Sequence, residues 1–316
     1  SNERNDRTME MRKLYNGYQI PDVAFGTGVI MRYTRNPILY LKKSIKEVLS
    51  SVKHHKLNRN LKGDFFCKKI LSNAYNAGYR LYDTARIYGY SEKRIGEMHK
   101  EDIYVISKVS DMDIERKYMP DTVSGNLNLS LRYLNREYVD VYLLHYPHGE
   151  WLNIYRQLEK LYIVGQAKSI GLCNCGINEL ETIKKNNLTK PMVIQLELHP
   201  LNSKKELRDY CKKNEIQIMA HTPTGRMETK IQNSSVLNKI AVRYNKTIPQ
   251  VILRWHYQNG IIPVLSTFDF CHMHENLKIY DFELSQNEME AIDSIDEGFV
   301  LLDSNCIDDP NYVYNL

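Results

Sequence analysis

The chain has 316 residues, of which 42% are hydrophobic and 26% are charged, the balance of an ordinary globular protein that can bury a large core. This composition excludes collagen-like, low-complexity and small disulfide-rich proteins, and no apolar stretch approaches the length of a membrane span. The net charge of +5, much of it within residues 32–62, is only weak evidence for nucleic-acid binding. We expect a cytoplasmic protein with reduced cysteines, a polar tail over residues 1–11, no signal peptide, and one domain over residues 12–316.

The first structural signal is an Asn-Gly pair between short apolar flanks over residues 14–20. Such a pair favours the tight turn of a β-hairpin. A hairpin ahead of the first strand could close the bottom of a barrel, or it could be an ordinary surface hairpin. The local pattern favours neither interpretation over the other.

An oversized segment over residues 32–63 follows the first predicted strand. Leu41, Ile45, Val48 and Val52 fall at helical spacing in it, with lysines around them. We therefore expect an inserted amphipathic helix and a basic loop. Because the segment follows the carboxyl end of a strand, we expect it to lie beside the mouth of a barrel.

Eight short apolar or β-branched runs recur along the chain, and helical patterns separate most of them. The expected strands span residues 23–26, 79–83, 103–108, 139–145, 169–172, 192–197, 216–221 and 261–265. The expected helices span residues 65–77, 120–134, 151–164, 178–185, 203–213, 236–244 and 248–257, and Asp64 stands where it could cap the first of them. Strands that alternate with helices predict either a closed (β/α)₈ TIM barrel or a long doubly wound parallel sheet.

Four residues capable of acid–base chemistry stand at or just beyond the ends of predicted strands. Asp83, Lys108 and His145 each end a strand, and Tyr88 follows Asp83 by five residues. Polar residues that close apolar strands are costly unless paired, and catalytic groups gather at the carboxyl ends of barrel strands. Any one of them alone is more often a cap or a satisfied core residue. The four together favour a catalytic site.

The chain resembles the aldo-keto reductase family in several motifs, which run from about Leu14 to Asp296 and are interrupted by the insertion. They are residues 78–88 (GYRLYDTARIY), 139–147 (VDVYLLHYP), 170–174 (IGLCN), 195–200 (QLELHP) and 253–255 (LRW). The resemblance implies the (β/α)₈ barrel. It also implies an NAD(P)H-dependent oxidoreductase that reduces an aldehyde, a ketone or a sugar to an alcohol.

The same resemblance implies a catalytic tetrad. Tyr88 would be the general acid that protonates the carbonyl oxygen, and the Lys108 ammonium would lower the pKa of its phenol. Asp83 would hold Lys108, and His145 would orient the substrate oxygen. The implied substrate-binding residues are Tyr88, His145, Tyr146 and Trp151.

A nicotinamide cofactor, NADP(H) or NAD(H), is implied as well. The amides of Asn174 and Gln195 match the positions that recognise the nicotinamide amide. The implied cofactor contacts are Gly26, Thr27, Asp83, Cys173, Asn174, Gln195, His221, Thr222, Ser266, Thr267, His272, Glu275 and Asn276.

Four positions depart from the family pattern. Ser266 and His272 replace the lysine and the arginine that usually bind the 2′-phosphate of NADPH, so discrimination for NADPH over NADH should weaken. His221 replaces the aromatic residue that usually stacks on the nicotinamide, and Cys173 replaces a serine. The loop after His145 is short, which predicts an open substrate site.

Other functions are weighed against this one. A non-catalytic or regulatory binding protein on the same barrel is the main alternative, favoured by the altered cofactor positions and the basic insertion. An unrelated barrel enzyme would need a metal or phosphate site, and the histidine pairs lack further ligands at zinc spacing. The Gly26-Thr27-Gly28 sequence lacks the third glycine of a Rossmann fingerprint. We expect a small-molecule substrate, no nucleic-acid or membrane partner, no metal, and a monomer or weak oligomer.

Overall fold

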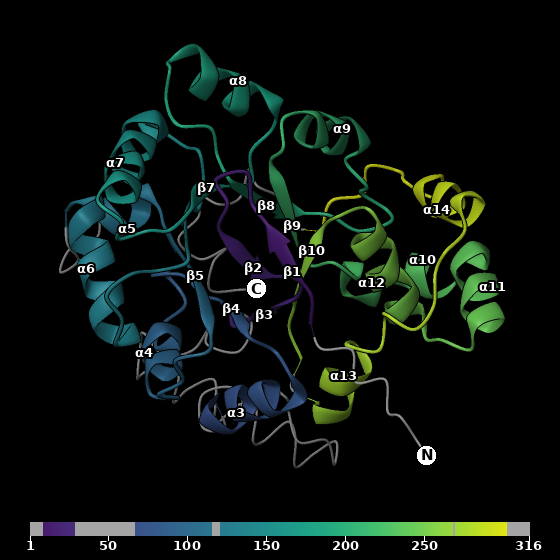
Figure 1. Cartoon of the computed structure of the whole chain (residues 1–316). Helices are drawn as coiled ribbons and strands as arrows, with labels where there is room; N and C mark the ends of the chain where they lie inside the picture. Colours follow the sequence, from purple (N-terminus) through teal and green to yellow (C-terminus); the bar gives the residue numbers. More distant parts are fainter. Residues whose placement is uncertain (1–8, 29–66, 116–120, 268, 302–316) are drawn as a thin grey trace, which may run out of the picture.

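The computed structural model describes residues 9–28, 67–115, 121–267 and 269–301, and within them eight parallel strands close into a barrel (Figure 1). Around the barrel the strand order is β10-β3-β4-β5-β6-β7-β8-β9. The strands are β3 (Ala24–Gly26), β4 (Leu81–Asp83), β5 (Tyr104–Val109), β6 (Val141–Leu144), β7 (Ile170–Cys173), β8 (Val193–Glu197), β9 (Gln217–His221) and β10 (Ile262–Leu265). The prediction of a closed barrel is therefore confirmed, and the doubly wound sheet is excluded. The predicted insertion over residues 32–63 and the Asp64 cap lie outside the described residues.

The strands are short and almost wholly buried, because side chains fill the barrel inside and helices cover it outside. At one place only a glycine fits between two strands. A Cβ atom on Gly171 of β7 would lie 1.7 Å from the carbonyl oxygen of Val193 in β8. The close approach of these strands therefore depends on the missing side chain.

Helices surround the barrel and bury one face each against it (Figure 1). Those longer than one turn are α3 (Cys67–Ala77), α4 (Ser91–Gly96), α5 (Asp111–Glu115), α6 (Val123–Leu134), α7 (Trp151–Ile163), α8 (Ile177–Lys185), α9 (Lys205–Lys213), α11 (Ser235–Tyr244), α12 (Ile248–Gln258), α13 (Phe270–Glu275) and α14 (Gln286–Asp293). Between β9 and α11 lie the short helices η1 (Gly225–Met227) and α10 (Thr229–Gln232).

Capping decides where the predicted helices begin. The helix expected from residue 120 begins at Val123, because the Thr122 hydroxyl accepts a hydrogen bond from the Gly125 amide at 3.1 Å. A reciprocal capping box between Thr247 and Gln250 starts α12 where the sequence pattern placed it.

The hairpin lies at the end of the barrel where the strands begin. It consists of β1 (Met11–Lys13) and β2 (Gln19–Pro21), joined by a turn in which Gly17 has a φ of +87°. The Tyr18 hydroxyl donates to the Asp140 carboxylate at 2.5 Å, and Asn16 donates to the Lys168 carbonyl at 3.1 Å. Asp140 directly precedes β6 and Lys168 lies two residues before β7, so the hairpin closes the bottom of the barrel, leaving the opposite end for function. Within the described residues, the helices are too short or too polar to cross a bilayer.

Candidate functional site

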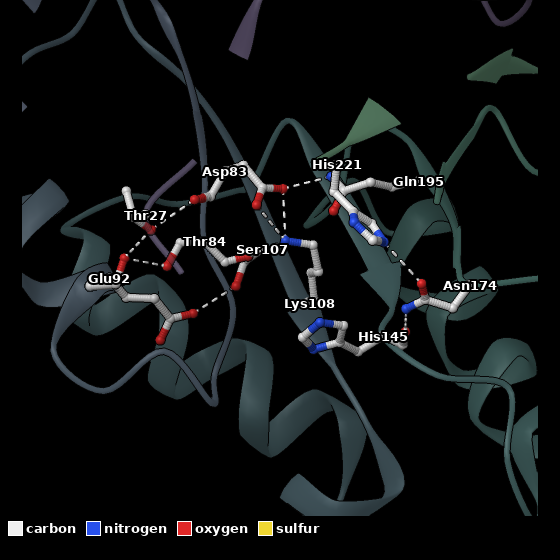
Figure 2. A network of polar contacts seen from close by, with 11 residues as sticks. Thr27, Asp83, Thr84, Glu92, Ser107, Lys108, His145, Asn174, Gln195 and His221 are labelled. Atoms are coloured by element: carbon white, nitrogen blue, oxygen red, sulfur yellow. Dashed lines mark hydrogen bonds and ion pairs between the residues drawn. The ribbon is translucent and has the colours of Figure 1, made fainter. Parts of the chain in front are cut away.

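The carboxyl ends of β4 and β5 bring Asp83 and Lys108 into direct contact (Figure 2). The Lys108 ammonium donates to both Asp83 carboxylate oxygens at 2.7 Å and to the Thr84 carbonyl at 3.0 Å. The two side chains are 0% and 5% exposed. The charges are therefore paired and out of water, where an electrostatic interaction is strong.

The loop between β4 and α4 places Tyr88 over this pair. The Lys108 nitrogen lies 5.0 Å from the centre of the Tyr88 ring, and the His145 ring meets that ring edge-on at 5.7 Å between centroids. A Cβ atom on Gly28 would lie 3.0 Å from Tyr88 Cζ. A small residue at position 28 thus leaves room for the phenol at the mouth of the barrel.

His145 follows β6 and is held as a neutral ring. Burial, and then the charge of Lys108, lower the pKa of His145 well below its ordinary value. Its imidazole stacks on the Tyr146 ring, with centroids 4.3 Å apart and planes 9° from parallel. The neutral ring can donate one hydrogen bond and accept another without carrying charge into the site.

Two amide side chains and one imidazole line the neighbouring strand ends (Figure 2). Asn174 follows β7 with a φ of +53°, and its Nδ2 donates to the His145 carbonyl at 3.1 Å. His221 Nε2 donates to Asn174 Oδ1 at 3.1 Å. Gln195 Nε2 donates to Asp83 Oδ2 at 2.7 Å. The amide groups therefore have fixed orientations relative to the Asp83–Lys108 pair.

The remaining hydrogen-bonding capacity of these amides suits a primary carboxamide. One N–H of Asn174 and Oε1 of Gln195 have no hydrogen bond within the described part of the chain. A carboxamide offers the matching acceptor and donors. The amide group of a nicotinamide thus fits the polar groups that the site leaves unsatisfied.

The other expected nicotinamide-side residues also lie at strand ends. Thr27 donates its hydroxyl to the Asp83 carbonyl at 2.8 Å, and the His221 ring contacts the Thr222 hydroxyl at 3.3 Å. Burial lowers the pKa of His221 to about 4, so its ring is neutral at physiological pH. The Cys173 thiol is buried beside Lys108 and Asp83, and burial raises its pKa above the usual range. Gly26 borders β10, where its Cβ would meet Val264 at 3.0 Å.

A second group of expected cofactor residues lies apart, after β10 and along α13. Ser266 and His272 are exposed there, and Thr267, Glu275 and Asn276 are partly exposed. The Asp269 carboxylate caps α13 by accepting from the Cys271 and His272 amides at 2.7 and 3.3 Å. These expected adenosine-side residues therefore follow β10, while the tetrad residues follow β4, β5 and β6.

The two further residues expected to bind substrate flank a short loop after β6. Tyr146 stacks between His145 and His148, and Trp151 begins α7 and packs half-buried against the core.

Among the described residues, no three His, Cys, Asp or Glu side chains are grouped as metal ligands.

Sequence reasoning missed a buried cluster directly behind the tetrad. Arg86, Glu92 and Ser107 are 3%, 1% and 0% exposed, and Glu92 contacts both of the others. The sequence Ser91-Glu92-Lys93-Arg94 has the appearance of a solvated helix start, so its charges carry no local sign of burial.

Comparisons with known proteins show which family the chain resembles in sequence and in fold. Residues 65–297 match the sequence model of the aldo/keto reductase family. A glyoxal reductase of Bacillus subtilis is 38% identical over 231 residues, which cover 71% of this chain and 81% of that protein. A 9,11-endoperoxide prostaglandin H2 reductase of Trypanosoma cruzi is 35% identical over 234 residues, which cover 71% and 80%. Among solved structures, a Bombyx mori aldo-keto reductase in complex with NADP superposes with a TM-score of 0.76 at 25% identity, covering 96% of this chain and 99% of that one.

Proposed function

Because the chain belongs to the aldo/keto reductase family, whose members are NAD(P)-dependent oxidoreductases, we propose that it reduces a small carbonyl compound to an alcohol. The compound is an aldehyde, a ketone or a sugar, and Tyr88 supplies the proton. One observation carries the proposal: the Lys108 ammonium is held by Asp83 at 2.7 Å while it lies 5.0 Å from the Tyr88 ring.

The Lys108 charge is what makes a phenol useful here. A free tyrosine is a poor acid at neutral pH, because its phenolate is unstable relative to the phenol. A buried ammonium beside the ring stabilises the phenolate, so the phenol gives up its proton more readily. Asp83 keeps the ammonium in place, and Gln195 holds the second carboxylate oxygen.

His145 orients the substrate in this proposal. Its Nδ1 is buried and has no hydrogen-bond partner among the described residues, so we place the ring proton on Nε2, where it can donate to the carbonyl oxygen. The neutral ring lies edge-on to Tyr88 at 5.7 Å between centroids, so both side chains would contact the same substrate oxygen. Tyr88 would then transfer the proton while the adjacent His145 aligns the substrate.

The nicotinamide cofactor supplies the hydride when it is bound. Asn174 and Gln195 would hold its carboxamide through the N–H and Oε1 that they leave unsatisfied. The neutral His221 ring, fixed by Asn174 and Thr222, would pack against the ring of the cofactor.

We further propose that the chain accepts NADH at least as well as NADPH. Residues 266–276 contain no lysine or arginine and include two carboxylates, Asp269 and Glu275. A 2′-phosphate near this segment would meet net negative charge instead of a cationic site. The NADP in the Bombyx mori structure describes what that protein binds, so this point rests on Ser266 and His272 of this chain.

A carbonyl panel that begins with glyoxal tests the reaction, because oxidation of NADH or NADPH is followed directly by absorbance. Tyr88→Phe is expected to lower kcat/KM by about a hundredfold or more. Tyr90→Phe is the matched control: it makes the same change at a 49% exposed position in the same loop and should retain activity. Cofactor binding by fluorescence without turnover of any carbonyl would favour the non-catalytic binding role instead.

A further inference from the structure

A second buried ionic cluster lies beside the tetrad. The Arg86 guanidinium is ion-paired with one Glu92 carboxylate oxygen, and the other oxygen accepts a hydrogen bond from Ser107 Oγ at 2.7 Å. Asp113 of α5 and Tyr142 of β6 are electrostatic neighbours of this pair, and burial raises the pKa of Asp113 to about 7. The groups that face Glu92 are therefore one cation, one carboxyl group whose pKa burial raises, and two hydroxyls.

The cluster connects the loop that carries Tyr88 to the strand that carries Lys108. Arg86 precedes Tyr88 by two residues, Glu92 follows it by four, and Ser107 directly precedes Lys108. The Arg86 amide also donates to the Lys108 carbonyl at 3.1 Å. The Glu92 carboxylate thus contacts the loop on one side and β5 on the other.

Additional hydrogen bonds tie the base of the same loop (Figure 2). The Thr84 hydroxyl donates to Ser91 Oγ at 2.7 Å, and the Thr84 carbonyl accepts from the Lys108 ammonium at 3.0 Å. The loop is therefore held at its start by Lys108 itself. The loop ends where α4 begins, and there it is held by the buried contacts of Glu92 with Arg86 and Ser107.

An ion pair in this position does little for stability by itself. Removing two charges from water costs about as much as their attraction returns, and well-packed apolar residues often stabilise a protein as well. The charge-assisted contacts of Glu92 with Arg86 and Ser107 instead favour one arrangement of the segments that they connect. The segments connected here are the Tyr88 loop and β5, and the distance between them sets the strength of the Lys108–Tyr88 interaction.

We propose that Glu92 is a positioning residue for the proton donor: through Arg86 and Ser107 it fixes the Tyr88 loop against β5. The inference rests on the proposed function, because it assigns Glu92 an effect on proton donation by Tyr88. Glu92 does not touch the reacting atoms. Its loss lets the loop shift, which weakens the interaction of the phenol with the ammonium and misaligns the donor.

Glu92→Gln in the full chain tests this, with the carbonyl compound that the wild type reduces fastest. We expect the single-turnover rate of cofactor oxidation to fall roughly tenfold or more, since small misplacements of reacting groups have effects of this size. The KM for the carbonyl and the Kd for the cofactor should stay within about twofold. The alkaline limb of the rate should move to higher pH, because a phenol farther from the ammonium is a weaker acid.

Glu97→Gln is the matched control, since Glu97 ends α4 and pairs with Lys68 and Arg94 near the surface. A folded Glu92→Gln protein that keeps its rate, or loses rate without a shift of the alkaline limb, overturns the inference. If Glu92→Gln does not fold, Ser107→Ala decides, because it removes one hydrogen bond and leaves the ion pair. It should lower the rate about threefold with the same shift in pH, and an unchanged rate overturns the inference. A wild type that reduces no carbonyl compound would instead refute the proposed function.

Discussion

The Lys108 ammonium donates to both carboxylate oxygens of Asp83 at 2.7 Å, with the two side chains 0% and 5% exposed. Neither side chain is open to bulk solvent, so each charge depends on the other for compensation. Stability and the candidate chemistry therefore rely on the same pair. The first prediction follows from this dependence.

Asp83→Asn leaves the buried Lys108 charge without its counter-ion. We expect a loss of about 3–5 kcal/mol in the free energy of unfolding, measured in urea, together with a large loss of carbonyl reduction. Asp102→Asn is the control, because it breaks a surface pair with Arg80 in which the side chains are 54% and 31% exposed. That change should cost less than about 1 kcal/mol. Equal losses in the two variants would contradict the importance assigned to the Asp83–Lys108 pair.

In the proposed function, cofactor preference depends on two exposed positions after β10, Ser266 and His272. Replacing Ser266 by Lys and His272 by Arg should strengthen NADPH binding by about tenfold or more, since a charge-assisted contact with the 2′-phosphate contributes on the order of 1.5–3 kcal/mol. NADH binding should stay within about twofold, because NADH lacks that phosphate. Fluorescence titration gives the two dissociation constants side by side. A wild type that already binds NADPH far more tightly than NADH would show that other residues supply the cationic site.

His256 of α12 is expected to contribute to the loss of folding stability at acid pH. Its Nε2 donates to the Pro223 carbonyl at 2.9 Å, and burial lowers its pKa to about 3. The folded pKa lies below the unfolded value of about 6.5, so the neutral ring stabilises the fold fully above pH 6.5. This contribution is lost as the pH falls toward 3, because the unfolded chain binds the proton first.

His256→Gln isolates that effect, since the variant side chain does not titrate. The difference in unfolding free energy between wild type and variant should shrink by about 1.4 kcal/mol per pH unit between pH 6 and pH 4. Urea unfolding at several pH values measures it. Buried Asp22 and Asp113, whose pKa values burial raises to about 6 and about 7, change stability in the opposite direction in both proteins and cancel in the difference. A constant difference would mean that His256 titrates normally in the folded protein.

Periodicity located the strands and long helices but not the short helices. The eight expected strands coincide with β3–β10, because runs of buried apolar residues bounded by polar ones are a local property. Helices such as α4 and α13 have only six residues each, too few turns for a helical period to stand out. The start of α6 was placed three residues early, since capping by Thr122 outweighed the apolar pattern.

The sequence predicted the tetrad residues but not the buried Glu92. Asp83, Lys108 and His145 stood out because polar residues at strand ends are unusual, and Tyr88 because it follows Asp83 by five residues. The family resemblance then assigned proton donation to Tyr88. Glu92 was missed, since a glutamate beside two basic residues has the composition of an exposed helix start. Its buried carboxylate accepts a hydrogen bond from Ser107 of β5, a residue 15 positions away in the sequence.

The sequence by itself determined the alternation of strands and helices, the family, and the polar residues that end the strands. These are properties of neighbours in the chain and of their spacing. Only the tertiary structure decided which strand ends face one another, because barrel closure sets distances between residues far apart in sequence. For this reason Asp83 accepts a hydrogen bond from Gln195, which is 112 positions away in the sequence. The same closure places the Lys108–Asp83 pair next to the Tyr88 ring.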